Sequence, residues 1–215
     1  MNKNYQLVLD GTIENAVKNN KVPKLLLHSC CAPCSSYVLE YLSKYFDITV
    51  YYYNPNIYPP SEFAVRSEEQ KRLVSEMHFE HPVKVVCENY EPNEFYSAVS
   101  GHEDDREGGE RCRLCFELRL GKTAEYAKKH GFDYFTTTLS ISPLKNAAVL
   151  NETGAEIARR SGVDYLFSDF KKRSGYKRSC ELSAQYGLYR QDYCGCVFSM
   201  RQRQEDKNCP DKNNC

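Results

Sequence analysis

The chain has 215 residues, with 29 Lys and Arg balanced by 29 Asp and Glu, so its formal net charge is zero. This balance excludes a protein that holds nucleic acid through a global positive field, and any anionic partner needs a local patch. No apolar run approaches the roughly 20 residues of a membrane span, and the first residues lack the pattern of a secretory signal. We therefore expect a cytoplasmic protein without a membrane segment.

Predicted strands and helices alternate along the first half of the chain. Residues 24–29 are an apolar run typical of a buried strand, and Ser35 and Ser36 can cap the helix that follows. β-branched and aromatic residues predict the next strands. The further elements expected here are a strand at 48–53, a helix at about 61–77, a strand at 83–87 and a short helix near Pro92.

The second half continues the alternation. A helix is expected from Glu110 to His130, with Gly131 as its left-handed cap. Strands are predicted at 134–138 and 165–167, separated by a helix at about 146–161. This order predicts an α/β fold, with a Rossmann-like parallel sheet covered by helices on both faces. We expect one domain over residues 1–200 and a polar, flexible tail over 201–215.

Seven of the eleven cysteines fall into tight groups. In a reducing compartment, such clusters are metal ligands or catalytic thiols more often than a disulfide framework. The first group follows a predicted strand, so it should lie at the carboxyl edge of the sheet, where open α/β sheets bind ligands. The groups are Cys30, Cys31 and Cys34; Cys112 and Cys115; and Cys194 and Cys196. No role is predicted for the outlying Cys87, Cys180, Cys209 and Cys215.

Seven thiolates exceed the four that complete a zinc site or a cubane iron-sulfur cluster. Because neighbouring side chains diverge, Cys30 and Cys31 are expected to reach two irons of one cluster, or two centres, rather than to chelate one small ion. A strand end and a helix start can converge, which brings the second group close to the first. The predicted cluster ligands are Cys30, Cys31, Cys112 and Cys115.

The remaining thiols allow two interpretations. Cys34, Cys194 and Cys196, with Asp169 as an oxygen ligand after the fifth strand, could hold a second metal with an open position. Alternatively, Cys194 and Cys196 form a redox dithiol, since a disulfide across a single glycine is strained and readily reduced.

Two other classes of protein stay open. The segment Cys31-Ala32-Pro33-Cys34 is also typical of a thioredoxin-like thiol-disulfide oxidoreductase, which would use only two of the thiols. A zinc-dependent RNA-binding module without catalysis is the third candidate. Lys171, Lys172 and Arg173 form a basic cluster that suits RNA, although a short run of this kind is more often a solvated loop than a nucleic-acid site.

Several separated motifs together resemble the QueH-type epoxyqueuosine reductases, over nearly all of residues 25–199. The motifs are Leu27-His28-Ser29-Cys30-Cys31-Ala32-Pro33-Cys34-Ser35, Asn54-Pro55-Asn56-Ile57, Gly109-Glu110-Arg111-Cys112-Arg113-Leu114-Cys115-Phe116, Thr136-Thr137-Thr138-Leu139-Ser140-Ile141-Ser142-Pro143, Asp169-Phe170-Lys171-Lys172 and Tyr189-Arg190-Gln191-Asp192-Tyr193-Cys194-Gly195-Cys196. The resemblance implies an enzyme that reduces the epoxide of epoxyqueuosine at the wobble position of a tRNA anticodon, giving queuosine. It also implies a [4Fe-4S] cluster, a nearby mononuclear iron, no cobalamin and an external electron donor.

The same resemblance implies a fold similar to the nucleotide-binding family that includes the tRNA-thiolating ATP pyrophosphatases. Cysteines replace the glycine-rich phosphate loop, so no use of ATP is expected. Epoxide removal needs two electrons, and a cubane cluster cycles by one, so the extra iron or the Cys194 and Cys196 pair is expected to act as a second redox element. Asp169 is the expected proton donor or metal ligand. The expected contacts to tRNA phosphates are Lys171, Lys172, Arg173 and Arg190.

Overall fold

A five-stranded, all-parallel sheet forms the centre of the computed structural model, which describes residues 3–208. The strands are β1 (Lys24–His28), β2 (Asp47–Tyr52), β3 (Val83–Cys87), β4 (Tyr134–Thr137) and β5 (Asp164–Tyr165). The helices are α1 (Tyr5–Lys18), α2 (Ala32–Leu42), α3 (Pro60–Glu76), α4 (Pro92–Ala98), α5 (Glu110–His130), α6 (Ala147–Ser161), α7 (Gly175–Gln185) and α8 (Val197–Asn208). A 3₁₀ turn, η1 (Thr138–Ile141), follows β4.

The strand order is β3-β2-β1-β4-β5, so the chain moves outward from β1 in one direction and outward from β4 in the other. The loops after β1 and β4 therefore diverge, which opens a crevice at the carboxyl edge of the sheet. This topology confirms the predicted α/β, Rossmann-like parallel sheet.

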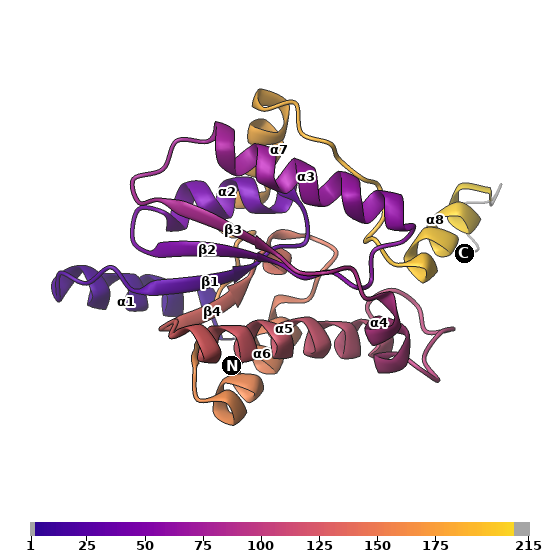
Figure 1. The fold of residues 1–215 in the computed structure, drawn as a ribbon, viewed down its shortest axis with the longest axis horizontal. Coiled ribbons are helices and arrows are strands. Elements are labelled where there is room, and N and C mark those ends of the chain that lie inside the picture. The colour runs from indigo at the N-terminus through magenta and orange to yellow at the C-terminus, as the bar shows by residue number, and fades with distance from the viewer. Residues whose placement is uncertain (1–2, 209–215) are drawn as a thin grey trace.

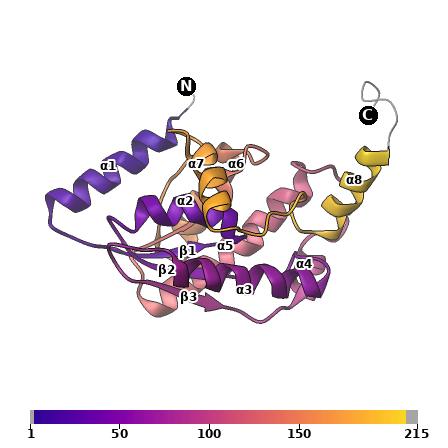
Figure 2. The same ribbon diagram turned by 90° about the horizontal axis from the view of Figure 1, so that it is seen from above.

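Helices cover both faces of the sheet, as Figures 1 and 2 show. Every side chain from Leu25 to Leu27 is fully buried, which is typical of a central parallel strand. Leu25 and Leu27 belong to a core with α1, α2 and α3, whereas Leu26 belongs to a core with α5 and α6. Successive side chains of β1 thus fill opposite faces, as the pleat of a strand requires.

The end of the described chain packs against α4. The rings of Phe95 in α4 and Phe198 in α8 lie 6.2 Å apart between centroids. Phe95 belongs to an apolar cluster with Cys115 and Cys196, and Phe198 packs against this cluster. No helix within residues 3–208 is long and apolar enough to span a bilayer.

The sequence predictions hold at two elements and differ at others. β3 and α5 have the predicted bounds, and Gly131 caps α5 in the left-handed conformation. The predicted capping by Ser35 and Ser36 is wrong: α2 begins at Ala32, because Pro33 suits a first turn where its missing N–H needs no partner. Residues 201–208, which the sequence places in a polar tail, continue helix α8, while 209–215 lie outside the described residues.

Candidate functional site

The turn between β1 and α2 carries the first cysteine group. The chain bends at Cys30, and Cys31 is the extended N-cap residue of α2. The backbone N–H of Cys30 donates to the Thr138 hydroxyl at 3.4 Å, which ties the turn to the loop after β4. The group therefore lies at the crevice where the strand order reverses.

The three thiols of this turn converge. Among residues 3–208, Cys30, Cys31 and Cys34 are the one group of three or more His, Cys, Asp or Glu side chains whose ligand atoms all lie within 4.8 Å of one another. The sulfurs of Cys30 and Cys31 are 3.7 Å apart. The expected divergence of these neighbours is thus wrong, because the bend at Cys30 turns both side chains to one side.

These three thiols differ in acidity. Hydrogen bonds from Cys31 and Cys34 lower the pKa of Cys30 well below its usual range, and the nearby Arg119 charge acts in the same direction. Hydrogen bonding to Cys30, together with burial, raises the pKa of Cys31 to about 12 and also raises that of Cys34. One acidified thiol beside two thiol hydrogen-bond donors is an arrangement typical of a soft-metal or redox site.

The other two cysteine groups lie together beside the first. Burial raises the pKa of Cys112, Cys115 and Cys196, and a charge on Cys194 acts in the same direction on all three. The pKa of Cys196 rises to about 12. Cys115 and Cys196 share one apolar cluster. Cys30 and Cys112 both pack against a second cluster formed by Phe116, Leu139 and Leu150.

The seven thiols are all free, as are Cys87 and Cys180, which lie outside these groups. The structure therefore holds no disulfide between Cys194 and Cys196. It also places Cys34 with Cys30 and Cys31, whereas the sequence interpretation assigned Cys34 to a separate centre. Cys209 and Cys215 lie outside the described residues.

A cavity of about 760 Å³ opens over the thiols, lined by Cys30, Cys31, Cys34 and Cys194 among other residues. Leu139 to Lys145 form one wall, and the segment from Arg190 to Cys194 forms another. Tyr176 of α7 lies at the cavity and is half exposed. Thiols at the base and an aromatic ring at the wall suit a ligand with a flat, unsaturated part.

A buried ion pair joins the cavity wall to the last cysteine group. The Lys145 ammonium lies 2.7 Å from a Glu107 carboxylate oxygen, and its side chain is only 7% exposed. The Ser199 hydroxyl donates to Glu107 at 2.9 Å and accepts from the backbone N–H of Cys194 at 3.1 Å. Burial alone would lower the pKa of Lys145, but the charges of Cys194 and Glu107 raise it above its usual value. Lys145 is therefore held as a cation beside Cys194.

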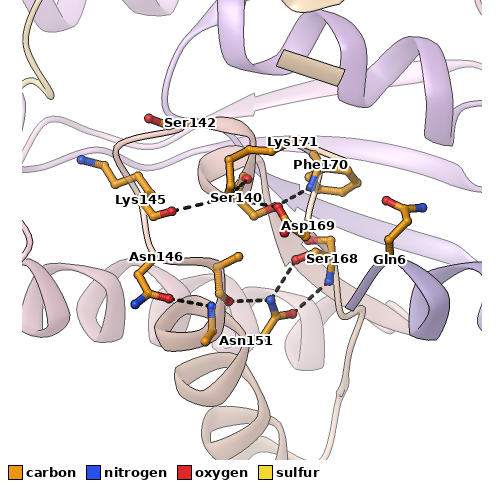
Figure 3. A network of polar contacts seen from close by, with 12 residues as sticks. Gln6, Ser140, Ser142, Lys145, Asn146, Asn151, Ser168, Asp169, Phe170 and Lys171 are labelled. Carbon is orange, nitrogen blue, oxygen red and sulfur yellow. Dashed lines mark hydrogen bonds and ion pairs between the residues drawn. The ribbon is translucent and has the colours of Figure 1, made fainter. Parts of the chain in front are cut away.

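Asp169 lies in the loop after β5 and forms an ion pair with Lys171, at 3.1 Å. The Lys171 ammonium also donates to the carbonyls of Ser140 and Lys145, at 2.9 and 3.4 Å, as Figure 3 shows. Lys171 thus fixes the loop that forms the cavity wall. Asp169 is not among the described residues that line the cavity, and its role as proton donor or ligand stays a prediction.

The other predicted RNA-binding side chains lie in different surroundings. Arg173 forms an ion pair with Asp10 of α1 at 2.7 Å, and Lys172 is exposed. Arg190 is exposed and lines the cavity. Arg106 and Arg203, which the sequence interpretation did not single out, line the cavity as well.

Two buried residues near the thiols were also missed by sequence interpretation. His28 directly precedes the first cysteine group, and Arg119 lies four residues after Cys115 on α5. Spacing of four places Arg119 on the same helix face as Cys115, so this signal was available in the sequence. Burial, followed by the nearby Arg119 charge, lowers the pKa of His28 to about 3, so the ring is neutral.

Comparison with known proteins gives one consistent family. Relatives named epoxyqueuosine reductase QueH occur in Streptococcus pyogenes serotype M1, at 44% identity over 92% of this chain and 78% of the relative. The relative from Staphylococcus epidermidis is 44% identical over 91% of this chain and 84% of its own length. The relative from Thermotoga maritima is 37% identical over 84% of this chain and 92% of its own length. The sequence model of that family matches residues 25–202, the span that holds all seven grouped cysteines, and the chain therefore belongs to the epoxyqueuosine reductase QueH family.

Proposed function

We propose that this chain reduces epoxyqueuosine in a tRNA to queuosine. In this reaction the epoxide accepts two electrons and two protons, both carbon–oxygen bonds break, a carbon–carbon double bond forms, and the oxygen leaves as water. Membership of the family supports the reaction class. The single observation that carries the proposal is the convergence of three thiols at the base of a cavity large enough for a modified base.

The donor set fits an iron-sulfur centre. Thiolates are the ligands preferred by such clusters, and three thiols within 4.8 Å of one another, with four more beside them, exceed the needs of one zinc ion. We assign the metal ligands to the three cysteine groups: Cys30, Cys31 and Cys34; Cys112 and Cys115; and Cys194 and Cys196. When bound, a [4Fe-4S] cluster with an adjacent iron supplies single electrons and a Lewis acid.

The protein's own residues bind and orient the substrate. The loop from Leu139 to Lys145, fixed by Lys171, shapes the pocket for the base, and the Tyr176 ring offers a face for stacking. The buried Lys145 and Glu107 pair holds a charged ammonium at the cavity wall next to Cys194, which provides a proton donor for the departing oxygen. We further propose that the protein acts in the cytoplasm and takes electrons from an external donor.

Iron and acid-labile sulfide in protein isolated without oxygen test this proposal. We expect both in the wild type, and loss of both in Cys30→Ser. The control is Cys87→Ser, which alters a thiol of β3 outside the groups and should keep full iron and sulfide. Zinc without sulfide would favour the RNA-binding module. Thiol-disulfide exchange activity in metal-free protein would favour a thioredoxin-like oxidoreductase that uses Cys31 and Cys34.

A further inference from the structure

A buried arginine lies next to the thiols. Arg119 of α5 is 1% exposed, and its Nη1 lies 3.9 Å from the sulfur of Cys115. Its charge favours the thiolate form of both Cys30 and Cys115, although burial outweighs it at Cys115, whose pKa is raised. The guanidinium is therefore within electrostatic reach of one thiol from each of the three cysteine groups, namely Cys30, Cys115 and Cys194.

Arg119 has no carboxylate partner, a feature that it shares with the buried Arg111 at the start of α5, whose Nη1 donates to backbone carbonyls. Two other buried cations of this region do have such a partner. Arg66 pairs with Glu62 at 2.6 Å, and Lys145 pairs with Glu107 at 2.7 Å. Within the described part of the chain, no carboxylate oxygen lies within 4.0 Å of the Arg119 guanidinium. A guanidinium stays charged in proteins, and burying it without an anion is costly.

The polar partners of Arg119 are neutral. Its Nη2 donates to the Asn54 side-chain oxygen at 2.6 Å, and its Nε donates to His28 Nε2 at 3.3 Å. His28 Nε2 also lies 3.2 Å from the Tyr53 carbonyl oxygen, and His28 Nδ1 lies 2.9 Å from the Thr137 hydroxyl. The ring accepts from Arg119 in the tautomer that carries its proton on Nδ1. These contacts aim the third edge of the guanidinium at Cys115 and leave the charge to be balanced by sulfur.

We propose that Arg119 is the counter-charge of the thiolate metal centre, a positioning residue that stabilises its more negative, reduced state. The inference rests on the proposed function. A fixed positive charge in a water-poor site favours the oxidation state with the extra electron. Arg119 thus makes the centre easier to reduce, and it acts through the ligands without touching the substrate.

The test compares Arg119→Gln, Arg119→Lys and the control Arg160→Gln in protein isolated without oxygen. Arg160 is an exposed arginine of α6 that pairs with Glu117 of α5, the helix that carries Arg119. The control therefore removes an equal charge from the solvent side. The readouts are iron and sulfide per chain, and the midpoint potential from a dye-mediated titration followed by absorbance.

We expect Arg119→Gln to shift the midpoint potential to more negative values and to lower iron retention. Arg119→Lys keeps the charge and should stay much closer to the wild type in potential. Arg160→Gln should match the wild type in both readouts. If Arg119→Gln does not retain the centre while Arg119→Lys does, the requirement for a cation is equally supported.

Three outcomes would overturn the role of Arg119: an unshifted potential in a loaded Arg119→Gln protein, an equal shift in Arg119→Lys, or a fall in Tm of the metal-free Arg119→Gln chain that accounts for its lost iron. The last result would mark Arg119 as ordinary packing. A wild type without iron and sulfide overturns the proposed function itself, which separates the two failures.

Discussion

At the scale of single residues, one glycine allows the last cysteine pair to approach the rest of the site. Gly195 has φ of +129°, and a Cβ added there would lie 3.0 Å from Arg66 Nη1 and 3.3 Å from Ile57 Cγ1. Its carbonyl accepts from the backbone N–H of Tyr58 at 2.8 Å. The backbone between Cys194 and Cys196 is therefore held against two other segments, which only glycine permits.

Gly195→Ala should reduce iron retention more than it reduces stability. The added methyl group pushes the Cys194 to Cys196 segment away from Arg66, and backbone strain adds about 1–3 kcal/mol. Gly101→Ala is the matched control, since it also has a positive φ, of +83°, but nothing lies within 4 Å of its Cβ. Iron per chain and Tm are measured for both variants. Full iron retention in Gly195→Ala would show that this close approach does not position the thiols.

At the scale of elements, the side chain of Asn151 provides backbone hydrogen bonds that a longer strand β5 would otherwise make. β5 spans only Asp164–Tyr165, and beyond it Asn151 of α6 satisfies the backbone of Ser168 in both directions. Asn151 Nδ2 donates to the Ser168 carbonyl at 2.8 Å, and the Ser168 N–H donates to Asn151 Oδ1 at 2.9 Å, as Figure 3 shows. This bridge fixes the start of the loop that carries Asp169 and Lys171.

Replacing Asn151 with leucine should lower the free energy of unfolding by about 2–4 kcal/mol, because a buried N–H and a buried carbonyl of Ser168 each lose their partner. Asn146→Ala provides the comparison. Asn146 caps the same helix by accepting from the N–H groups of Ala148 and Val149, and its loss should cost about 1 kcal/mol. Urea denaturation measures both. A loss in Asn151→Leu no larger than that in Asn146→Ala would show that water replaces the bridge.

The elements also show what the sequence could predict. The apolar run of β1 and the capped pattern of α5 were sufficient, because both patterns are local. Helix α8 was not predicted, because it buries only Val197 and Ser199 and so has almost no apolar face to recognise. α1 was not predicted either, although Leu9 and Ile13 anchor it in the core.

The candidate site was predictable only in part, for the same reason. Grouped cysteines after a strand predicted a site at the carboxyl edge of the sheet, where Cys30, Cys31 and Cys34 do converge. Their mutual distances depend on the bend at Cys30, which no periodicity encodes. The partners that balance charge, such as Glu107 for Lys145, come from segments far apart in sequence and meet only through the fold.

At the scale of the whole molecule, the proposed binding of tRNA must depend on where each cation lies, because the net charge is zero. Ion pairs already engage Lys171 and Arg173, with Asp169 and Asp10. Arg190 is exposed at the cavity, and its Nη1 has one contact, to the Ser183 hydroxyl at 2.9 Å. A phosphate next to the target base would therefore meet Arg190 before it meets the basic cluster predicted from the sequence.

Arg190→Gln should weaken tRNA binding and flatten its dependence on salt. The slope of log K against log salt is negative, and each phosphate contact that is lost makes it shallower by about 0.7–0.9, since fewer counterions are released. Lys177→Gln is the matched control, because Lys177 is exposed on α7 and is not among the described residues that line the cavity. Binding of an unmodified tRNA at several salt concentrations gives both slopes. An equal change in the two variants would mean that diffuse surface charge, rather than the rim of the cavity, holds the tRNA, and a flat response in the wild type would mean that phosphate contacts contribute little.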